Sequence, residues 1–153
     1  MSSLDDSYFG LRNLALTVRA TDIGLPSSSA VHAALLEINM GRATVTLACF
    51  ATGDASLYFS TGGGTIGGRQ IPAVRDAAIR LVRLVEAKRE ILTPVDEVAM
   101  PNDNRFNVVA LTSGGPRVAI GTVESADKET TPLAEMFRAG QEVITAFRES
   151  DWR

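Results

Sequence analysis

The sequence predicts an α+β protein in which a single antiparallel sheet of about five strands is covered by helices. Two patterns favour this class. Segments with alternating apolar and polar residues form a group of three and a group of two, on either side of a long amphipathic segment. Turn-forming residues separate the segments within each group, as in antiparallel hairpins. The 153 residues contain no dividing linker, so we expect one domain over residues 1–153, with a disordered tail over residues 1–10.

The first part of the chain predicts a short helix followed by a strand. Residues 11–18 fit both a weak alternation and a helical stripe, and we predict a short helix there. Residues 21–29 are dense in turn formers and predict a loop. Residues 31–38 are apolar almost throughout, so periodicity does not distinguish a buried strand from a buried helix turn. Their length, bounded by that loop and by a turn at residues 39–42, favours a strand.

Two further strands complete a predicted three-stranded meander. In residues 43–51, the side chains of Val45, Leu47 and Cys49 share one face, and this period of two is typical of a half-buried strand. After a short turn, residues 56–60 alternate in the same way. Successive strands joined by such short turns are expected to pair in antiparallel fashion.

The second half of the chain predicts two helices and a hairpin. Pro72 begins a helix whose apolar side chains repeat at helical spacing to about Leu92. Segments 105–112 and 117–124 flank a Ser-Gly-Gly-Pro turn and predict the hairpin. Thr131 is the expected N-cap of the closing helix, with a proline at its first position. The predicted order is therefore three strands, a helix, two strands and a helix, after a short N-terminal piece.

Composition excludes several classes of protein. The chain has one cysteine, Cys49, and one histidine, His32, which excludes a disulfide framework and a four-ligand zinc site within one chain. The net charge of −3 argues against non-specific binding of nucleic acid. Asp5 and Asp6 stand where a secretory leader would carry positive charge, and no run approaches the ~18 apolar residues of a membrane span. We expect a cytoplasmic protein with no cofactor and no metal, and with neither nucleic acid nor membrane among its partners.

A glycine-rich run between the third strand and the long helix departs from this background. Five glycines fall within residues 61–68, and ordering them costs conformational entropy, so an ordered loop needs a reason. Close packing is one reason, and a ligand is another. Backbone N–H groups at the N-terminus of the following helix favour an anion such as phosphate or carboxylate. The candidate ligand-binding residues are Thr61, Gly62, Gly63, Gly64, Thr65, Gly67, Gly68, Arg69 and Arg75.

Known nucleotide-binding motifs do not fit this run. Gly62, Gly64 and Gly67 match the spacing of the dinucleotide fingerprint, but the strands before them form a meander rather than a parallel strand–helix–strand unit. Arg69 and Gln70 occupy the positions where a phosphate-binding loop needs Lys and Ser or Thr. A structural or merely flexible role for the run therefore weighs more than an anion site.

The run from Ser56 to Gly68, SLYFSTGGGTIGG, resembles a motif of small bacterial proteins of unknown function. The similarity extends over most of the chain after about Leu25 and includes the later segment 139–144. The resemblance implies a bacterial cytoplasmic protein and supplies no substrate or catalytic residue. The order of the expected elements is also loosely similar to that of profilin-like and roadblock-like interaction domains, and this likeness concerns the fold only.

The remaining chemistry-bearing residues favour a non-catalytic protein. His32 lies in an apolar run and is expected to be a buried structural residue rather than a general base. Cys49 is expected to be buried and unreactive. The leading hypothesis is an interaction domain that associates with itself, as a homodimer, or with another protein through its sheet edges. The alternative is an anion- or phosphate-binding protein or enzyme that uses the glycine run 62–68.

Overall fold

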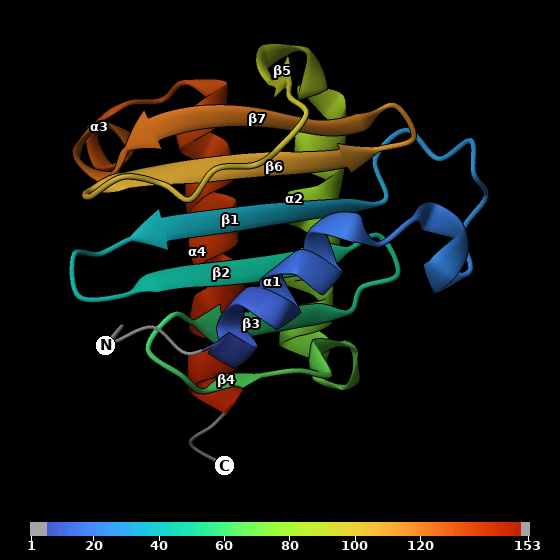
Figure 1. Cartoon of the computed structure of the whole chain (residues 1–153), viewed down its shortest axis with the longest axis horizontal. Coiled ribbons are helices and arrows are strands. Elements are labelled where there is room, and N and C mark those ends of the chain that lie inside the picture. Colours follow the sequence, from blue (N-terminus) through green and yellow to red (C-terminus); the bar gives the residue numbers. More distant parts are fainter. Residues whose placement is uncertain (1–5, 151–153) are drawn as a thin grey trace.

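The computed structural model describes residues 6–150, which contain one seven-stranded sheet with antiparallel neighbours (Figure 1). The strand order is β4-β3-β2-β1-β6-β7-β5. The strands are β1 (Ala33–Asn39), β2 (Thr44–Phe50), β3 (Ala55–Phe59), β4 (Gly64–Thr65), β5 (Thr93–Pro94), β6 (Arg105–Thr112) and β7 (Gly115–Thr122). The α-helices are α1 (Asp6–Thr17), α2 (Pro72–Ala87), α3 (Val123–Lys128) and α4 (Pro132–Ser150). The short 3-10 helices are η1 (Ala20–Ile23), η2 (Gly68–Gln70) and η3 (Arg89–Ile91).

The α+β class with an antiparallel sheet is confirmed, but the expected number of about five strands is wrong. The two additional strands, β4 and β5, have two residues each and pair with β3 and β7 at the edges of the sheet. Two residues are too few to produce an alternating pattern, so no periodicity marks them in the sequence. The five longer strands follow the predicted ranges to within a few residues.

The helices cover the two faces of the sheet unequally. α2 and α4 lie side by side across one face, and α1 crosses the opposite face (Figure 1). Along β1, Leu36 and Ile38 enter the main core beneath α2 and α4, whereas Ala33 and Leu35 belong to a smaller cluster beneath α1. Because both faces of β1 are buried, the strand is apolar almost throughout. This is why periodicity alone did not distinguish it from a helix.

Local sequence determines where the later helices begin. The predicted starts at Pro72 and Pro132 are confirmed, and the Thr131 hydroxyl accepts a hydrogen bond from the backbone N–H of Ala134 at 3.2 Å. α2 ends earlier than predicted, and η3 follows it. α3 was not expected, because its six residues are too few for an apolar stripe, although Thr122 caps it.

The N-terminal region corrects one expectation. Residues 1–5 lie outside the described part of the chain, whereas residues 6–10 form the first turns of α1 instead of a disordered tail. Tyr8 is only 2% exposed because it packs under the helix against the sheet, and its ring meets that of Phe9 edge-on. The hydrogen-bond partners of Tyr8, Thr46 and Met100, lie far along the chain, so no local sequence pattern predicts that this segment is ordered. The helix expected at residues 11–18 is confirmed and begins earlier than predicted.

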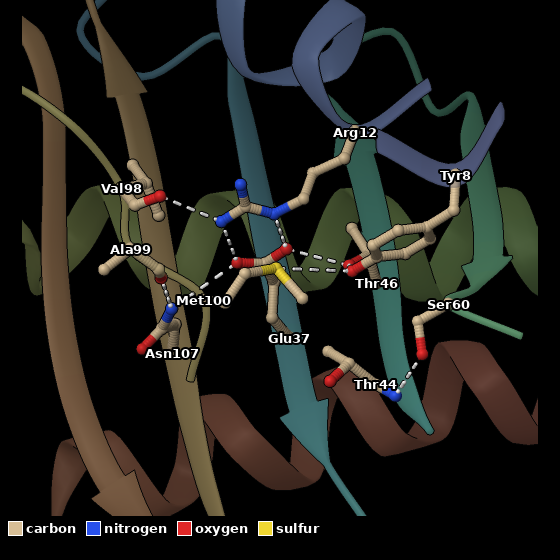
Figure 2. A network of polar contacts seen from close by, with 10 residues as sticks. All are labelled: Tyr8, Arg12, Glu37, Thr44, Thr46, Ser60, Val98, Ala99, Met100 and Asn107. Atoms are coloured by element: carbon tan, nitrogen blue, oxygen red, sulfur yellow. Dashed lines mark hydrogen bonds and ion pairs between the residues drawn. The ribbon is translucent and has the colours of Figure 1, made fainter. Parts of the chain in front are cut away.

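A buried polar network attaches α1 to the sheet (Figure 2). The Glu37 side chain of β1 is fully buried and accepts two hydrogen bonds from Arg12 of α1, at 2.6 and 2.8 Å. Thr46 of β2 donates a third bond at 2.8 Å, and the amide of Asn107 on β6 lies at 3.4 Å. The carboxylate is tolerated in the interior because a bidentate guanidinium and neutral donors replace its hydration.

The same network extends beyond the ion pair. Because Thr46 donates its single hydroxyl proton to Glu37, the Tyr8 hydroxyl donates to Thr46 at 2.6 Å. Arg12 also donates to the carbonyl oxygen of Val98 at 3.0 Å, so α1 holds the segment that leads into β6. Burial lowers the pKa of Arg12, but its hydrogen bond to Glu37 and the Glu37 charge outweigh burial, and the pKa is raised overall.

We expect Tyr8 to make the fold sensitive to alkaline pH. Burial raises the pKa of its hydroxyl above the ordinary value of 10.0. A phenol whose pKa is higher in the folded chain stabilises the fold fully below the unfolded pKa, and this stabilisation is lost as pH rises through the folded pKa. The melting temperature of Tyr8→Phe, measured by circular dichroism, should therefore fall less than that of the wild type as the pH rises from about 9 to about 11. Equal losses in the two proteins would contradict this assignment.

Candidate functional site

A cavity of about 610 Å³ lies between the helix-covered face of the sheet and the C-terminal half of α4. Of the fourteen residues between 6 and 150 that line it, eight are apolar, four are polar and uncharged, one is a glycine and one is an arginine. Its volume falls within the range of small-molecule pockets, roughly 300–1,000 Å³. The cavity is therefore the candidate functional site.

The register of the meander builds the sheet wall of the cavity. Ile38 of β1 pairs with Val45 of β2, and Val45 pairs with Phe59 of β3, so three apolar side chains form a row across adjacent strands. Leu57 lies two residues earlier on β3, on the same face, where it pairs with Thr65 of β4. Strand alternation turns these apolar side chains toward α4. We call them the sheet wall, which consists of Ile38, Val45, Leu57 and Phe59.

α4 supplies the opposite wall. Gln141, Ile144 and Arg148 all line the cavity, and their i, i+3, i+7 spacing places them on one face of the helix. Just before this face begins, Gly140 packs so closely on β1 that a Cβ atom there would collide with Leu36. The glycine allows α4 to approach the sheet closely. Beyond it, the larger side chains of Gln141, Ile144 and Arg148 line the cavity.

Four polar side chains of the lining have no partner in the part of the chain that the structure describes. Thr65, Asn104, Gln141 and Arg148 form no side-chain hydrogen bond or ion pair with any residue between 6 and 150. Asn39, the fifth polar residue of the lining, is instead bonded to two backbone groups. Among the residues of the lining that the structure describes, Arg148 is the single charged one. A ligand would thus find available hydrogen-bonding groups of both kinds and one positive charge.

Asn104 holds an uncommon backbone conformation at the edge of this cavity. Its φ of 62° is the one positive value among the non-glycine residues of the described chain. Its N–H donates to the carbonyl oxygen of Asn39 at 3.2 Å, and its own carbonyl oxygen accepts from the N–H of Val123 at 3.1 Å. Asparagine tolerates the left-handed region better than most residues. These two bonds fix the point where β1, β6 and α3 meet.

The glycine-rich run forms the turn of the β3–β4 hairpin. The N–H of Phe59 donates to the carbonyl oxygen of Gly63 at 3.1 Å, and the N–H of Gly62 donates to the carbonyl oxygen of Phe59 at 2.9 Å. Gly64 lies so close to β3 that a Cβ atom there would collide with the carbonyl oxygen of Leu57. Close packing of backbone on backbone is a sufficient reason for glycine at this position.

The structure brings only part of the predicted site to the cavity. Gly64 and Thr65 line it, and residues 62–65 also line a second hollow of about 230 Å³ between the hairpin and α1. Thr61 and Gly67 are exposed and line neither hollow. Gly68 is buried in the core, where a Cβ atom would lie 2.6 Å from a methyl group of Val74 and 2.9 Å from the Phe147 ring.

The two arginines of the predicted site lie away from the cavity. The backbone N–H of Arg69 donates to the carboxylate of Asp54 at 3.2 Å. Arg75 makes an exposed ion pair with its neighbour Asp76 at 3.5 Å, and its side chain crosses the backbone of Gly53. An acidic side chain of the protein thus already lies against the N–H groups that precede α2.

His32 and Cys49 are buried, as expected. One ring nitrogen of His32 lies 2.8 Å from the carbonyl oxygen of Val18, and the other has no hydrogen-bond partner in the structure. Burial raises the pKa of the Cys49 thiol, which keeps it in its neutral form. Between residues 6 and 150, no three His, Cys, Asp or Glu side chains gather in a way that could hold a metal ion.

No sequence pattern singled out Asn104, Gln141 or Arg148 as a site residue. The available signal was the spacing of Gln141 and Arg148 around Ile144, which puts polar groups beside an apolar helical stripe. Most amphipathic helices have such borders, so the signal has little specificity. Asn104 belongs to a turn cluster, where asparagine is common for structural reasons.

Compared with protein-family models, curated proteins and solved structures, the chain shows no match. The resemblance of its glycine-rich motif to small bacterial proteins stays a prediction. Every helix in the described part of the chain is too short or too polar to cross a bilayer. Function is therefore inferred from the residues of this chain alone.

Proposed function

We propose that this protein binds a small molecule with an apolar body in the cavity between the sheet wall and α4, without catalysing a reaction. The cavity itself carries the proposal: eight apolar side chains line about 610 Å³, and four polar side chains there have no partner in the described chain. Binding sites for small molecules share this composition, in which a few polar groups fix the orientation of the ligand. The fourteen lining residues include no histidine, cysteine or acidic residue, so they offer no general base and no activated nucleophile.

The glycine-rich run has a part in this proposal. Gly64 allows β4 to approach β3, and this approach places Thr65 in the lining of the cavity. The sequence alternatively predicts a ligand site at this run, and our proposal keeps residues 64–65 of that site. The proposed ligand is apolar rather than a simple anion, because the walls of the cavity are apolar and do not include the N-terminus of α2.

Thermal-shift measurements with 1-decanol test the proposal. Decanol should raise the melting temperature of the wild-type protein, since a molecule that binds only the folded chain stabilises it. Ile144→Trp should fill the cavity and abolish the shift. Ile120→Trp, a matched change at a 59% exposed position on β7, should leave the shift unchanged. No shift in the wild type, or an equal shift in Ile144→Trp, contradicts the proposal.

Self-association through α1 is a second candidate function, favoured by the exposure of its apolar residues. Leu14 is 67% exposed, and Leu11 of the same helix and Ile66 of the hairpin border the hollow between these two elements. Arg12 turns inward to its ion pair, so residues 7–17 present no charged side chain outward. An uncharged apolar surface can face a second copy of itself without repulsion between like charges.

The sheet edges offer less for self-association than the sequence suggested. The two-residue strands β4 and β5 cover part of the outer strands β3 and β7. Pro94 of β5 has no N–H to donate to another chain. We therefore place the contact between two copies on the side chains of α1 rather than on the backbone of an edge strand.

Light scattering coupled to size exclusion tests this second function. The wild-type protein should elute as a dimer at micromolar concentration, and Leu14→Lys should convert it to a monomer. Ile120→Lys, at a position of similar exposure on β7 rather than on α1, should leave the dimer intact. A wild-type monomer over the whole concentration range would refute self-association.

Both proposed functions are compatible with the cytoplasmic location that the sequence predicts.

A further inference from the structure

We infer that the ligand of the cavity is an amphipathic monocarboxylate, whose carboxylate binds Arg148 and whose hydrocarbon part lies between the sheet wall and Ile144. This inference rests on the function proposed above and specifies its ligand. Three properties of the lining support it: its single charge, its uncharged donors, and its apolar walls.

Charge favours an anion. Arg148 is the only ionisable residue among the described residues of the lining, and none of those residues carries a carboxylate that competes for it. Its guanidinium has no ion-pair partner between residues 6 and 150, in contrast to Arg12, which is fully engaged with Glu37. The C-terminal end of α4 carries about half a negative charge, which the full positive charge of the guanidinium outweighs.

Geometry favours a carboxylate over other anions. The planar fork of an arginine matches the two oxygens of a carboxylate in a bidentate pair. Thr65, Asn104 and Gln141 add neutral donors at the same cavity, and none of the three is engaged with another described residue. One guanidinium neutralises one negative charge, so a phosphate monoester with nearly two charges would leave part of its charge uncompensated.

The apolar part of the lining defines the rest of the ligand. Ile38, Val45, Phe59 and Leu57 form one wall, and Ile144 forms part of the other. These side chains present no hydrogen-bonding groups, so they accept hydrocarbon and disfavour a sugar or nucleotide, whose hydroxyls would remain unpaired. The occupant is thus apolar along most of its length and charged at one end.

Calorimetric titration of decanoate and 1-decanol into wild-type protein and into Arg148→Gln tests the inference. The wild type should bind decanoate at least about tenfold more tightly than decanol, in keeping with one charge-assisted pair. Arg148→Gln should remove this preference and leave the affinity for decanol unchanged. Arg83→Gln should behave like the wild type, because it removes the same charge from a position on α2 that is exposed, as Arg148 is, but does not line the cavity.

The outcomes separate this inference from the function on which it rests. If decanol and decanoate bind the wild type equally, and Arg148→Gln changes neither, the cavity binds apolar ligands but the monocarboxylate is overturned. If neither compound binds, the proposed function and the inference both fail. If decanoate is preferred but Arg83→Gln abolishes the preference as fully as Arg148→Gln does, net charge rather than Arg148 selects the ligand, and the inference fails.

Discussion

Replacing Arg12 by methionine is expected to lower the free energy of unfolding by about 3–5 kcal/mol. The change keeps most of the apolar length of the side chain but leaves the Glu37 carboxylate, fully buried in β1, without its bidentate partner. Thr46 and Asn107 remain as neutral donors and cannot neutralise the charge. Chemical denaturation followed by circular dichroism measures the loss.

Two further variants make this result specific to the ion pair. Arg19→Met removes an exposed arginine whose pair with Asp22 spans 3.5 Å, and we expect it to change stability by less than about 0.5 kcal/mol. Glu37→Gln should destabilise the wild type but stabilise Arg12→Met, because the amide needs no counter-charge. If Glu37→Gln lowers the stability of both backgrounds equally, the guanidinium and the carboxylate are not coupled and our account of the network is wrong.

Gly64→Ala is expected to cost about 3 kcal/mol or more, and Gly63→Ala only about 1–2 kcal/mol. Both glycines have positive φ, 158° at Gly64 and 84° at Gly63. An added Cβ at Gly63 meets open space, so backbone strain is the only cost of the substitution there. At Gly64 the added Cβ also collides with the carbonyl oxygen of Leu57. That oxygen belongs to β3 and cannot move without disturbing the sheet.

The two glycine variants form their own control, since they are neighbours in the same turn. Thermal melts of both proteins, under identical conditions, give the comparison. A smaller loss at Gly64 than at Gly63 would show that the β3–β4 contact is not tight in solution. The result also bears on ligand experiments: a larger side chain at Gly64 disturbs the fold itself, so Ile144→Trp is the cleaner way to block the cavity.

The predictable part of the fold is the part that local patterns encode. α2 has a proline at its first position and one continuous apolar stripe, so both its type and its start follow from its own residues. β2 shows the limit of such inference. Its alternation correctly predicts a strand, but the polar side chain of Thr46 is fully buried beneath α1, not exposed. Alternation reports two chemically different faces and does not say whether the polar one meets water.

The cavity could not be predicted because its residues come together only in the tertiary structure. Asn104, Arg148 and the sheet wall belong to segments far apart in the sequence, and their spacing along the chain encodes nothing about their meeting. The sequence singled out the glycine run but left open whether it is ordered, and in the structure it forms the turn of the β3–β4 hairpin. The sequence could not show that Gly64 serves backbone packing while the adjacent Thr65 reaches the cavity, because that distinction depends on the partner strand.

The ion pair that attaches α1 has a consequence for biosynthesis. Arg12 leaves the ribosome before every group it binds, and Val98 and Asn107 emerge only after most of the chain has been made. Until β1 and β2 emerge with Glu37 and Thr46, the helix has no surface on which to dock, and the hydrogen bond to Val98 forms later still. The attachment of α1 is thus complete only after the chain around β6 has been made, and a nascent chain halted before β6 would lack both the Arg12–Val98 hydrogen bond and the Asn107 amide.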